Sequence, residues 1–139
     1  MGKINVGRVV LGGLLAGLVV NVVEYVLNVF VLAERGNAAL AKLGLMPPGP
    51  QQIAWFIVTG FLLGIVLVFT YAAIRPRFGA SAKTALIAGA IVWLVGLFNS
   101  LGNVIIGFTP SDLAIIGMIV GLVEVEIAAI AGAWLYKET

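Results

Sequence analysis

Long apolar runs alternate with short polar links along the chain. Four runs, approximately residues 9–32, 53–74, 85–108 and 113–136, are long enough to cross a membrane. A hydrocarbon core about 30 Å thick is crossed by a helix of about 20 residues. Lipid offers no hydrogen-bond partner to the backbone, so a spanning segment of this length must be helical. The pattern therefore predicts an all-α membrane protein, a single domain over residues 1–139, built of four transmembrane helices.

The links between the runs predict how the helices are arranged. Short links make consecutive helices antiparallel neighbours, which predicts an up-down bundle. Lys and Arg gather on the side that holds both termini, and the positive-inside rule then places both termini in the cytoplasm. The basic residues on that side are Lys3, Arg8, Arg75, Arg77, Lys83 and Lys137, against Arg35 and Lys42 on the other side.

The link between the first two runs is longer than the others. Residues 33–45 are weakly amphipathic, with Leu40 and Leu43 set against Glu34 and Lys42. Such a segment is typical of a helix that lies in the membrane interface, and an irregular loop fits the pattern equally well. The two alternatives stay open at this point.

Composition narrows the classes of function. Hydrophobic residues make up 62% of the chain and charged residues 10%, a balance that a soluble domain of this size is unable to bury. There is no cysteine and no histidine. The usual ligands of haem, iron–sulfur and zinc centres are therefore missing, as are the usual nucleophile and general base. We expect no enzymatic activity, no metal site and no cofactor. Because the basic residues are scattered between apolar runs, we also expect no binding of nucleic acid.

Polar side chains inside the predicted spans are the candidate functional residues. A charged residue at the centre of a membrane helix costs about 2.5–3.5 kcal/mol on insertion scales, so its presence requires a compensating partner. Spacings of three and four residues, combined with the predicted directions of the spans, bring these side chains together in the middle and outer half of the membrane. The predicted cluster consists of Asn21, Glu24, Asn28, Asn99, Asn103 and Glu124.

Two interpretations of this cluster follow. It is either a hydrogen-bonded network that fixes the register of the helices or a hydrated pocket for a ligand or an ion. No Lys, Arg or His lies at the depth of Glu124. We therefore expect the carboxyl group of Glu124 to be protonated at neutral pH and to donate a hydrogen bond.

Glu126 points away from Glu124. Two positions along a helix turn a side chain by about 200° around the axis, and the neighbours of Glu126 on that face are bulky and apolar. Glu126 therefore meets either another helix of the bundle or another polypeptide. We predict that it is a contact with a partner or with a second copy in an oligomer.

Small residues recur at helical spacing in the first, second and fourth runs. Such residues allow membrane helices to approach closely. The predicted helix-packing positions are Gly13, Gly17, Gly60, Gly64, Gly117 and Gly121.

Several short motifs add a resemblance. They are GKINVGRV at residues 2–9, IRPRFG at residues 74–79, and GLVE at residues 121–124 together with AGAWLYKE at residues 131–138. With these motifs the chain resembles a family of small uncharacterised bacterial four-helix integral membrane proteins. The resemblance implies a location in the bacterial inner membrane and implies no activity.

Two functions fit these observations. The first is a non-enzymatic accessory or scaffold subunit, surrounded by the lipid bilayer, that associates with itself or with a larger membrane complex through its intramembrane helix faces. The alternative is a small proton- or cation-coupled channel or transporter, or a ligand-binding membrane protein, that uses the glutamate and asparagine cluster.

Overall fold

The computed structural model describes residues 3–138, which are helical with no strand among them. Four helices are long and apolar enough to cross a membrane, as the sequence predicts. The elements are α1 (Val6–Val26), the π-helix η1 (Leu27–Val31), α2 (Ala33–Lys42), α3 (Pro50–Phe78), α4 (Ala82–Ile105) and α5 (Ser111–Leu135). The first of the four membrane-length helices combines α1 with η1.

Local signals set the starts of the long helices. The side chain of Asn5 accepts a hydrogen bond from the backbone N–H of Arg8 at 3.1 Å and caps α1. Ser81 caps α4 in the same way through the N–H of Thr84. Both side chains satisfy a donor that has no partner within the helix. Pro50 occupies the first turn of α3, where its fixed φ suits a helix. The helices therefore begin a few residues earlier than the apolar runs predict.

α3 also ends later than predicted. It continues through Pro76 to Phe78, although the apolar run ends at residue 74. The helix ends where Gly79 adopts a φ of 88° and its N–H donates to the carbonyl of Arg75 at 2.8 Å. A positive φ is accessible to glycine without steric cost. Gly79, rather than the proline, therefore marks the end of α3.

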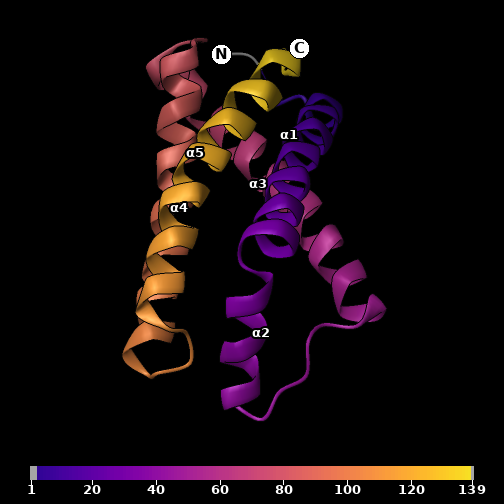
Figure 1. Cartoon of the computed structure of the whole chain (residues 1–139). Helices are drawn as coiled ribbons and strands as arrows, with labels where there is room; N and C mark the ends of the chain where they lie inside the picture. Colours follow the sequence, from indigo (N-terminus) through magenta and orange to yellow (C-terminus); the bar gives the residue numbers. More distant parts are fainter. Residues whose placement is uncertain (1–2, 139) are drawn as a thin grey trace.

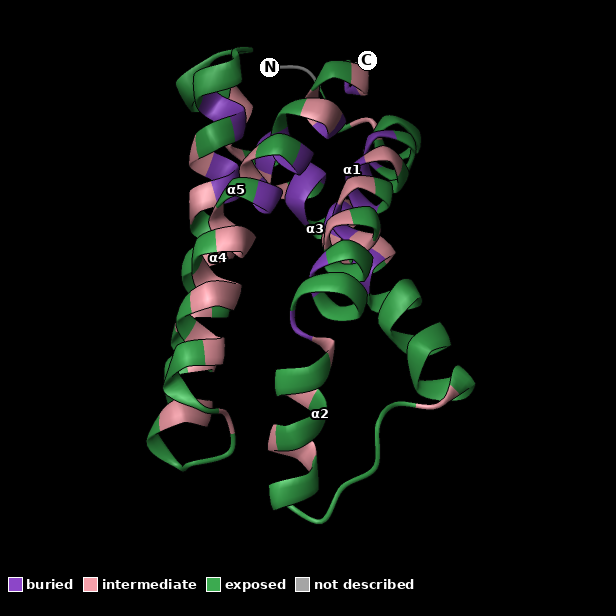
Figure 2. Ribbon diagram, viewed as in Figure 1, coloured by how far each residue is buried: buried purple, intermediate pink, exposed green. Residues whose placement is uncertain are grey.

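The long helices pack in a definite order. α1 lies between α3 and α5, and α4 packs against α5 and more lightly against α3. Buried residues gather where α1, α3 and α5 cross, toward the end of the molecule where the chain begins and ends (Figure 1, Figure 2). Ala16, Leu67, Val68 and Ala128 are fully enclosed there. Toward the opposite end the helices diverge and most of their residues are exposed (Figure 2).

The link between the first two spans is helical. α2 covers Ala33–Lys42, and none of its residues is buried. It follows η1 after Leu32, whose backbone has left the helical region. Arg35 forms an ion pair with Asp112 in the first turn of α5, so α2 stands beside the start of α5. The segment is therefore a helix and not an irregular loop, and its position in the membrane interface stays a prediction.

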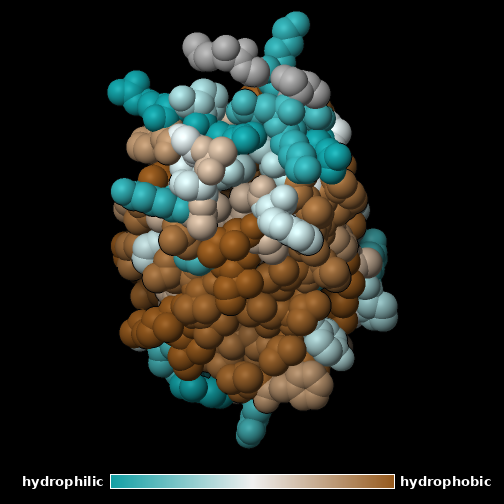
Figure 3. Space-filling model, turned by 90° about the horizontal axis from the view of Figure 1, so that it is seen from above, coloured by the Kyte–Doolittle hydropathy of each residue, from teal (hydrophilic) through white to brown (hydrophobic). Residues whose placement is uncertain are grey.

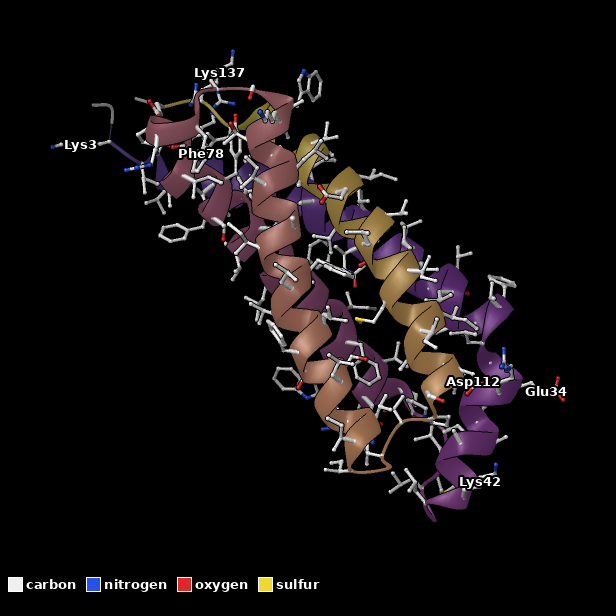
Figure 4. The ribbon with its side chains drawn as sticks, turned by 90° about the vertical axis from the view of Figure 1, so that its left-hand side faces the viewer. Lys3, Glu34, Lys42, Phe78, Asp112 and Lys137 are labelled. Carbon is white, nitrogen blue, oxygen red and sulfur yellow. The ribbon has the colours of Figure 1, made fainter. Side chains whose placement is uncertain are left out.

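The surface divides into apolar sides and charged ends. Hydrophobic residues form a continuous surface in the centre of Figure 3, with hydrophilic residues gathered along one side of the view. Lys3 and Lys137 lie at one end of the molecule, and Glu34, Lys42 and Asp112 lie at the other end (Figure 4). Exposed apolar surface on this scale requires an apolar environment around the helices.

Candidate functional site

The polar group on α1 is built around Glu24. Asn28 follows one helical turn later on the same face. Its Nδ2 atom donates to Oε2 of Glu24 at 2.7 Å and to the backbone carbonyl of Glu24 at 2.9 Å. The π-helix η1 begins at the same place, and the N–H of Leu32 donates to the carbonyl of Leu27 five positions earlier. Single π-helical turns inside α-helices frequently occur at functional sites.

Glu124 is the buried member of the site. It is only 4% exposed, and its Oε2 atom is enclosed with no hydrogen-bond partner. Glu124 lies on α5 and Glu24 on α1, two helices that pack against each other, and the two carboxyl groups are near enough to interact electrostatically. Because a carboxylate only accepts hydrogen bonds, a bond between the two groups forms only when one of them carries a proton. We call Glu24 and Glu124 the carboxyl pair.

Asn21 faces a different helix. Its Nδ2 atom donates to the backbone carbonyl of Ile57 on α3 at 3.1 Å, and a Cβ added at Gly60 would collide with its side chain. Asn21 therefore joins α1 to α3 and lies outside the group around the carboxyl pair. This is the register-fixing hydrogen bond that polar residues form between membrane helices.

Asn99 and Asn103 lie on α4, which packs against α5 and α3. Nδ2 of Asn103 donates to the backbone carbonyl of Asn99 one turn earlier, at 3.0 Å. Asn99 is exposed, and its side-chain amide has no hydrogen-bond partner among residues 3–138. The predicted cluster is therefore divided. Glu24 bonds to Asn28 and lies on a helix that packs against the helix of Glu124, whereas Asn21 bonds to α3, and Asn99 and Asn103 lie on α4.

Glu126 is directed toward α4. Its Oε2 atom is enclosed without a hydrogen-bond partner, and a Cβ added at Gly89 of α4 would lie 2.7 Å from that atom. The absence of a side chain at Gly89 leaves the space that the carboxyl group of Glu126 occupies. Of the two alternatives set out from the sequence, contact with another helix of the bundle is therefore found. A contact of Glu126 with a partner stays a prediction.

Glycines from both helices determine the crossing of α1 and α3. A Cβ at Gly13 would lie 2.5 Å from the Cα atom of Ile65, and one at Gly17 would lie 2.6 Å from the Cα atom of Phe61. A Cβ at Gly64 would in turn collide with the backbone of Gly13 and Gly17. Any side chain at these positions would push the two helix backbones apart.

Gly117 and Gly121 differ from the sequence-based expectation. A Cβ at either position would meet no atom within 4 Å, so neither glycine packs against a helix of this chain. The reason is where the helices cross. α5 approaches α1 at Gly132, where an added Cβ would lie 2.9 Å from the carbonyl of Gly12, and the two helices diverge in the other direction (Figure 1). Since Gly121 shares a helix face with Glu124, the open space begins beside the carboxyl pair.

A second polar cluster lies near the ends of the chain and was not predicted. The Arg75 guanidinium carbon lies 5.5 Å from the ring centroid of Tyr136, and the guanidinium group pairs with Glu138 at 3.7 Å. The rings of Tyr71 and Tyr136 meet edge to face at 5.9 Å. The backbone N–H of Asn5 donates to the Tyr136 hydroxyl at 3.4 Å. The only signal in the sequence was aromatic and basic residues at span ends, which is equally typical of interface anchors.

The fold and the site together define a class of protein. Four apolar helices of membrane-crossing length, with carboxyl groups enclosed between them, are characteristic of a multi-pass helical membrane protein. Comparisons with protein-family models, with curated proteins and with solved structures find no match for this chain. The function is therefore argued from the site itself.

Proposed function

We propose that this chain is a non-enzymatic membrane protein that binds or transports a proton or a small cation at the carboxyl pair. One observation carries the proposal: Oε2 of Glu124 is enclosed without a hydrogen-bond partner, on a membrane-length helix that packs against the helix of Glu24. A network that only fixes helix register does not need two acids, because asparagine performs that task without charge. Asn21 already does so between α1 and α3.

The charge of the pair has to be balanced from outside the chain. No basic residue lies between Arg8 and Arg35, between Lys42 and Arg75, or between Lys83 and Lys137. Ionised groups in a low-dielectric environment interact strongly and over a long range, and two like charges in contact are unfavourable there. Since no basic residue of the spans can balance the charge of the pair, a proton or a cation from solution has to do so.

Flux through reconstituted protein tests this proposal. Proteoliposomes should pass protons, monovalent cations or small cationic compounds, and Glu124→Gln should abolish that flux. Glu126→Gln is the matched control, because it changes a second enclosed glutamate two positions away on the same helix. The proposal fails if the wild-type protein gives no flux above that of empty liposomes from acidic to mildly alkaline pH.

We propose, as the setting of this function, an up-down bundle in the bacterial inner membrane with both termini in the cytoplasm. The excess of Lys and Arg at the end where the chain begins and ends supports this orientation. Single-cysteine variants Ser81→Cys and Asn37→Cys, labelled with a membrane-impermeant reagent, test it. Labelling of both positions from the same side of the membrane contradicts the proposed topology.

Association with a second copy or with a larger membrane complex is the second candidate function. The observation in its favour is the α4 face around Asn99. The Asn99 amide is exposed without a partner among the described residues, and a Cβ at Gly96 would meet no atom within 4 Å. An unpaired amide next to a small residue is typical of a surface on which another membrane helix docks.

Native mass spectrometry tests the association. Asn99→Leu and Gly96→Leu should shift oligomers or complexes toward the free chain, whereas Glu126→Leu should leave them intact because Glu126 faces α4. Loss of association in Glu126→Leu alone would instead support the contact predicted from the sequence. A wild-type protein that is monomeric and free of partners after gentle solubilisation excludes this candidate.

A further inference from the structure

A cavity of about 260 Å³ lies between the start of α4 and the later parts of α3 and α5. These segments lie toward the end of the molecule where the chain begins and ends (Figure 1). Ser81 caps α4 and Trp134 belongs to the last turn of α5, so the cavity lies at the height where two membrane-length helices reach the interface. Its lining includes Tyr71, Ser81, Ala82, Ile130, Ala133 and Trp134.

The rim of the cavity is open to the surroundings of the bundle. Trp134 is 78% exposed, and Ile130 and Ala82 are exposed as well. Exposed apolar side chains of membrane-length helices face lipid. Tryptophan is enriched at the height of the lipid headgroups, where its ring meets both apolar and polar surroundings. A molecule that fills this cavity from the bilayer therefore has an apolar part along α5 and a polar part near the start of α4.

Two polar groups at this place have no hydrogen-bond partner among residues 3–138. Tyr71 lines the cavity and is only 5% exposed, and its hydroxyl group makes no hydrogen bond there. Arg75 follows one turn later on the same face of α3, and its Nη1 atom is enclosed without a hydrogen bond, 3.7 Å from Glu138. Buried polar groups are normally hydrogen-bonded. Both groups can donate, so the missing partner is an acceptor such as an oxygen atom.

The charge around the cavity is positive. From residue 71 to residue 85 the chain carries Arg75, Arg77 and Lys83 and no acid. Lys83 follows directly after Ala82, which lines the cavity. Glu138 pairs with Arg75 and balances one of these charges. The remaining excess of positive charge favours a ligand with a negative polar part, and basic pockets between membrane helices bind lipid headgroups of that kind.

We propose that this cavity binds one anionic phospholipid from the surrounding leaflet. The acyl chains lie along Ile130 and Trp134, an oxygen atom of the glycerol ester or phosphate accepts a hydrogen bond from the hydroxyl group of Tyr71, and the phosphate lies near Lys83. The site is separate from the carboxyl pair and goes beyond the proposed function, which does not depend on it.

Native mass spectrometry of the purified full chain tests the preference for an anionic lipid. Phosphatidylglycerol and phosphatidylcholine with the same acyl chains are added at equal concentrations. Phosphatidylglycerol should bind about tenfold more tightly, because a basic residue near a membrane surface contributes about fivefold in affinity for anionic lipid and more than one is present. Lys83→Gln should therefore weaken its binding about fivefold. Lys42→Gln, at the opposite end of the molecule (Figure 4), should behave as the wild type.

Three further variants locate the site. Ala82→Phe places a ring in the cavity from an exposed position and should weaken binding of phosphatidylglycerol about tenfold. Tyr71→Phe keeps the ring and removes the donor, so binding should weaken about fivefold. Ala73→Phe is the matched control, because Ala73 is exposed on α3 outside the lining of the cavity. Circular dichroism and gel filtration verify that each variant is folded.

The other outcomes overturn the inference. Equal binding of the two lipids contradicts an anionic ligand, and equal losses in Ala73→Phe and Ala82→Phe contradict the location. Glycerol 3-phosphate, a water-soluble ester without acyl chains, is the last probe. If it binds as tightly as phosphatidylglycerol, the ligand is a soluble phosphate ester and the lipid assignment is wrong.

Discussion

Each of the three intramembrane glutamates is held by different neighbours. Glu24 accepts a hydrogen bond from Asn28 one turn away, and Glu124 is buried where α5 packs on α1, with its Oε2 atom unpartnered. Glu126 fits into the space left by Gly89. The cost of placing a carboxyl group in an apolar environment is fixed by the groups around it. The same residue type therefore forms a candidate ligand site on one face of α5 and a packing contact on the other.

The contact between Gly89 and Glu126 leads to the first prediction. Gly89→Val should lower the free energy of unfolding by about 1–3 kcal/mol, the usual cost of overpacking. Glu126→Ala in the same chain removes the colliding carboxyl group, so the double variant should recover part of that loss, with a coupling energy of about 0.5–3 kcal/mol. Both the free energy of unfolding and the coupling energy are measured by unfolding the variants in mixed micelles that contain an increasing fraction of a denaturing detergent.

Gly96→Val is the control for this comparison of single and double variants, because a Cβ at Gly96 would meet no atom of the chain within 4 Å. Its stability should stay within about 0.5 kcal/mol of the wild type, as is usual for surface substitutions. Additive losses in the double variant would contradict the contact.

Part of the site follows from the sequence at this scale. The spacing of Glu24 and Asn28 predicts a shared face, and the structure joins the two side chains by a hydrogen bond on α1, the helix that packs against α5. The division of the cluster does not follow from the sequence. α1 has α3 on one flank and α5 on the other. The periodicity of a sequence shows which residues share a face of a helix, but it does not show which neighbouring helix that face contacts. Asn21 accordingly bonds to Ile57 of α3.

At the scale of elements, the crossing of α1 and α3 shows how glycines place whole helices. The backbone atoms of Gly13 and Gly17 occupy the positions where a side chain at Gly64 would lie. Backbone atoms are unable to move aside as a flexible side chain can, so the distance between the helix axes depends on these residues.

A pair of matched substitutions tests this difference between glycines. Gly64→Ala should destabilise the protein by about 1–3 kcal/mol, because its Cβ collides with backbone. Gly117→Ala, whose Cβ meets open space, should be neutral or stabilising by up to about 1 kcal/mol, because alanine favours a helix over glycine. Thermal unfolding of both variants in the same detergent gives the comparison. Equal destabilisation of the two would mean that another helix also covers Gly117.

The elements themselves were largely predictable. Apolar runs of membrane length gave all four long helices, and the shifted ends trace to local residues such as Asn5, Ser81 and Gly79. The π-helical turn at Leu27–Val31 was not predictable. Nothing in the composition of five mostly apolar residues distinguishes a π-turn from an α-turn. The helix at Ala33–Lys42 was one of two open alternatives, because a segment of only 10 residues is too short for its pattern to exclude a loop.

At the scale of the whole molecule, the two ends are built differently. One end is tied by the crossing helices and by Arg75, which reaches Tyr136 and Glu138. The opposite end is held by the ion pair of Arg35 and Asp112, whose side chains are 52% and 55% exposed. The divergence of the helices was not predictable. It depends on where backbones cross, and a glycine pattern indicates possible crossings without selecting among them.

The ion pair leads to a prediction about α2. An exposed pair contributes about 0–1 kcal/mol, so Arg35→Ala should hardly change the unfolding temperature. Amide hydrogen exchange over Ala33–Lys42 should become faster, and high salt should have the same effect on the wild type. Lys42→Ala, on the same helix and without an ion pair among the described residues, is the control. Unchanged exchange in Arg35→Ala would show that other contacts hold α2.

The divergence of the helices also has a mechanical consequence. A molecule that is narrow where α1, α3 and α5 cross and wide at the opposite end is a wedge (Figure 1), and it takes up more area in one leaflet of a bilayer than in the other. A movement that closes the space beside Gly117 would change the area in that leaflet alone. The work done by the lateral tension of the bilayer equals that tension multiplied by the change in area. This work then contributes to the free energy of closing. The shapes of the surrounding lipids would therefore influence how far α1 and α5 diverge.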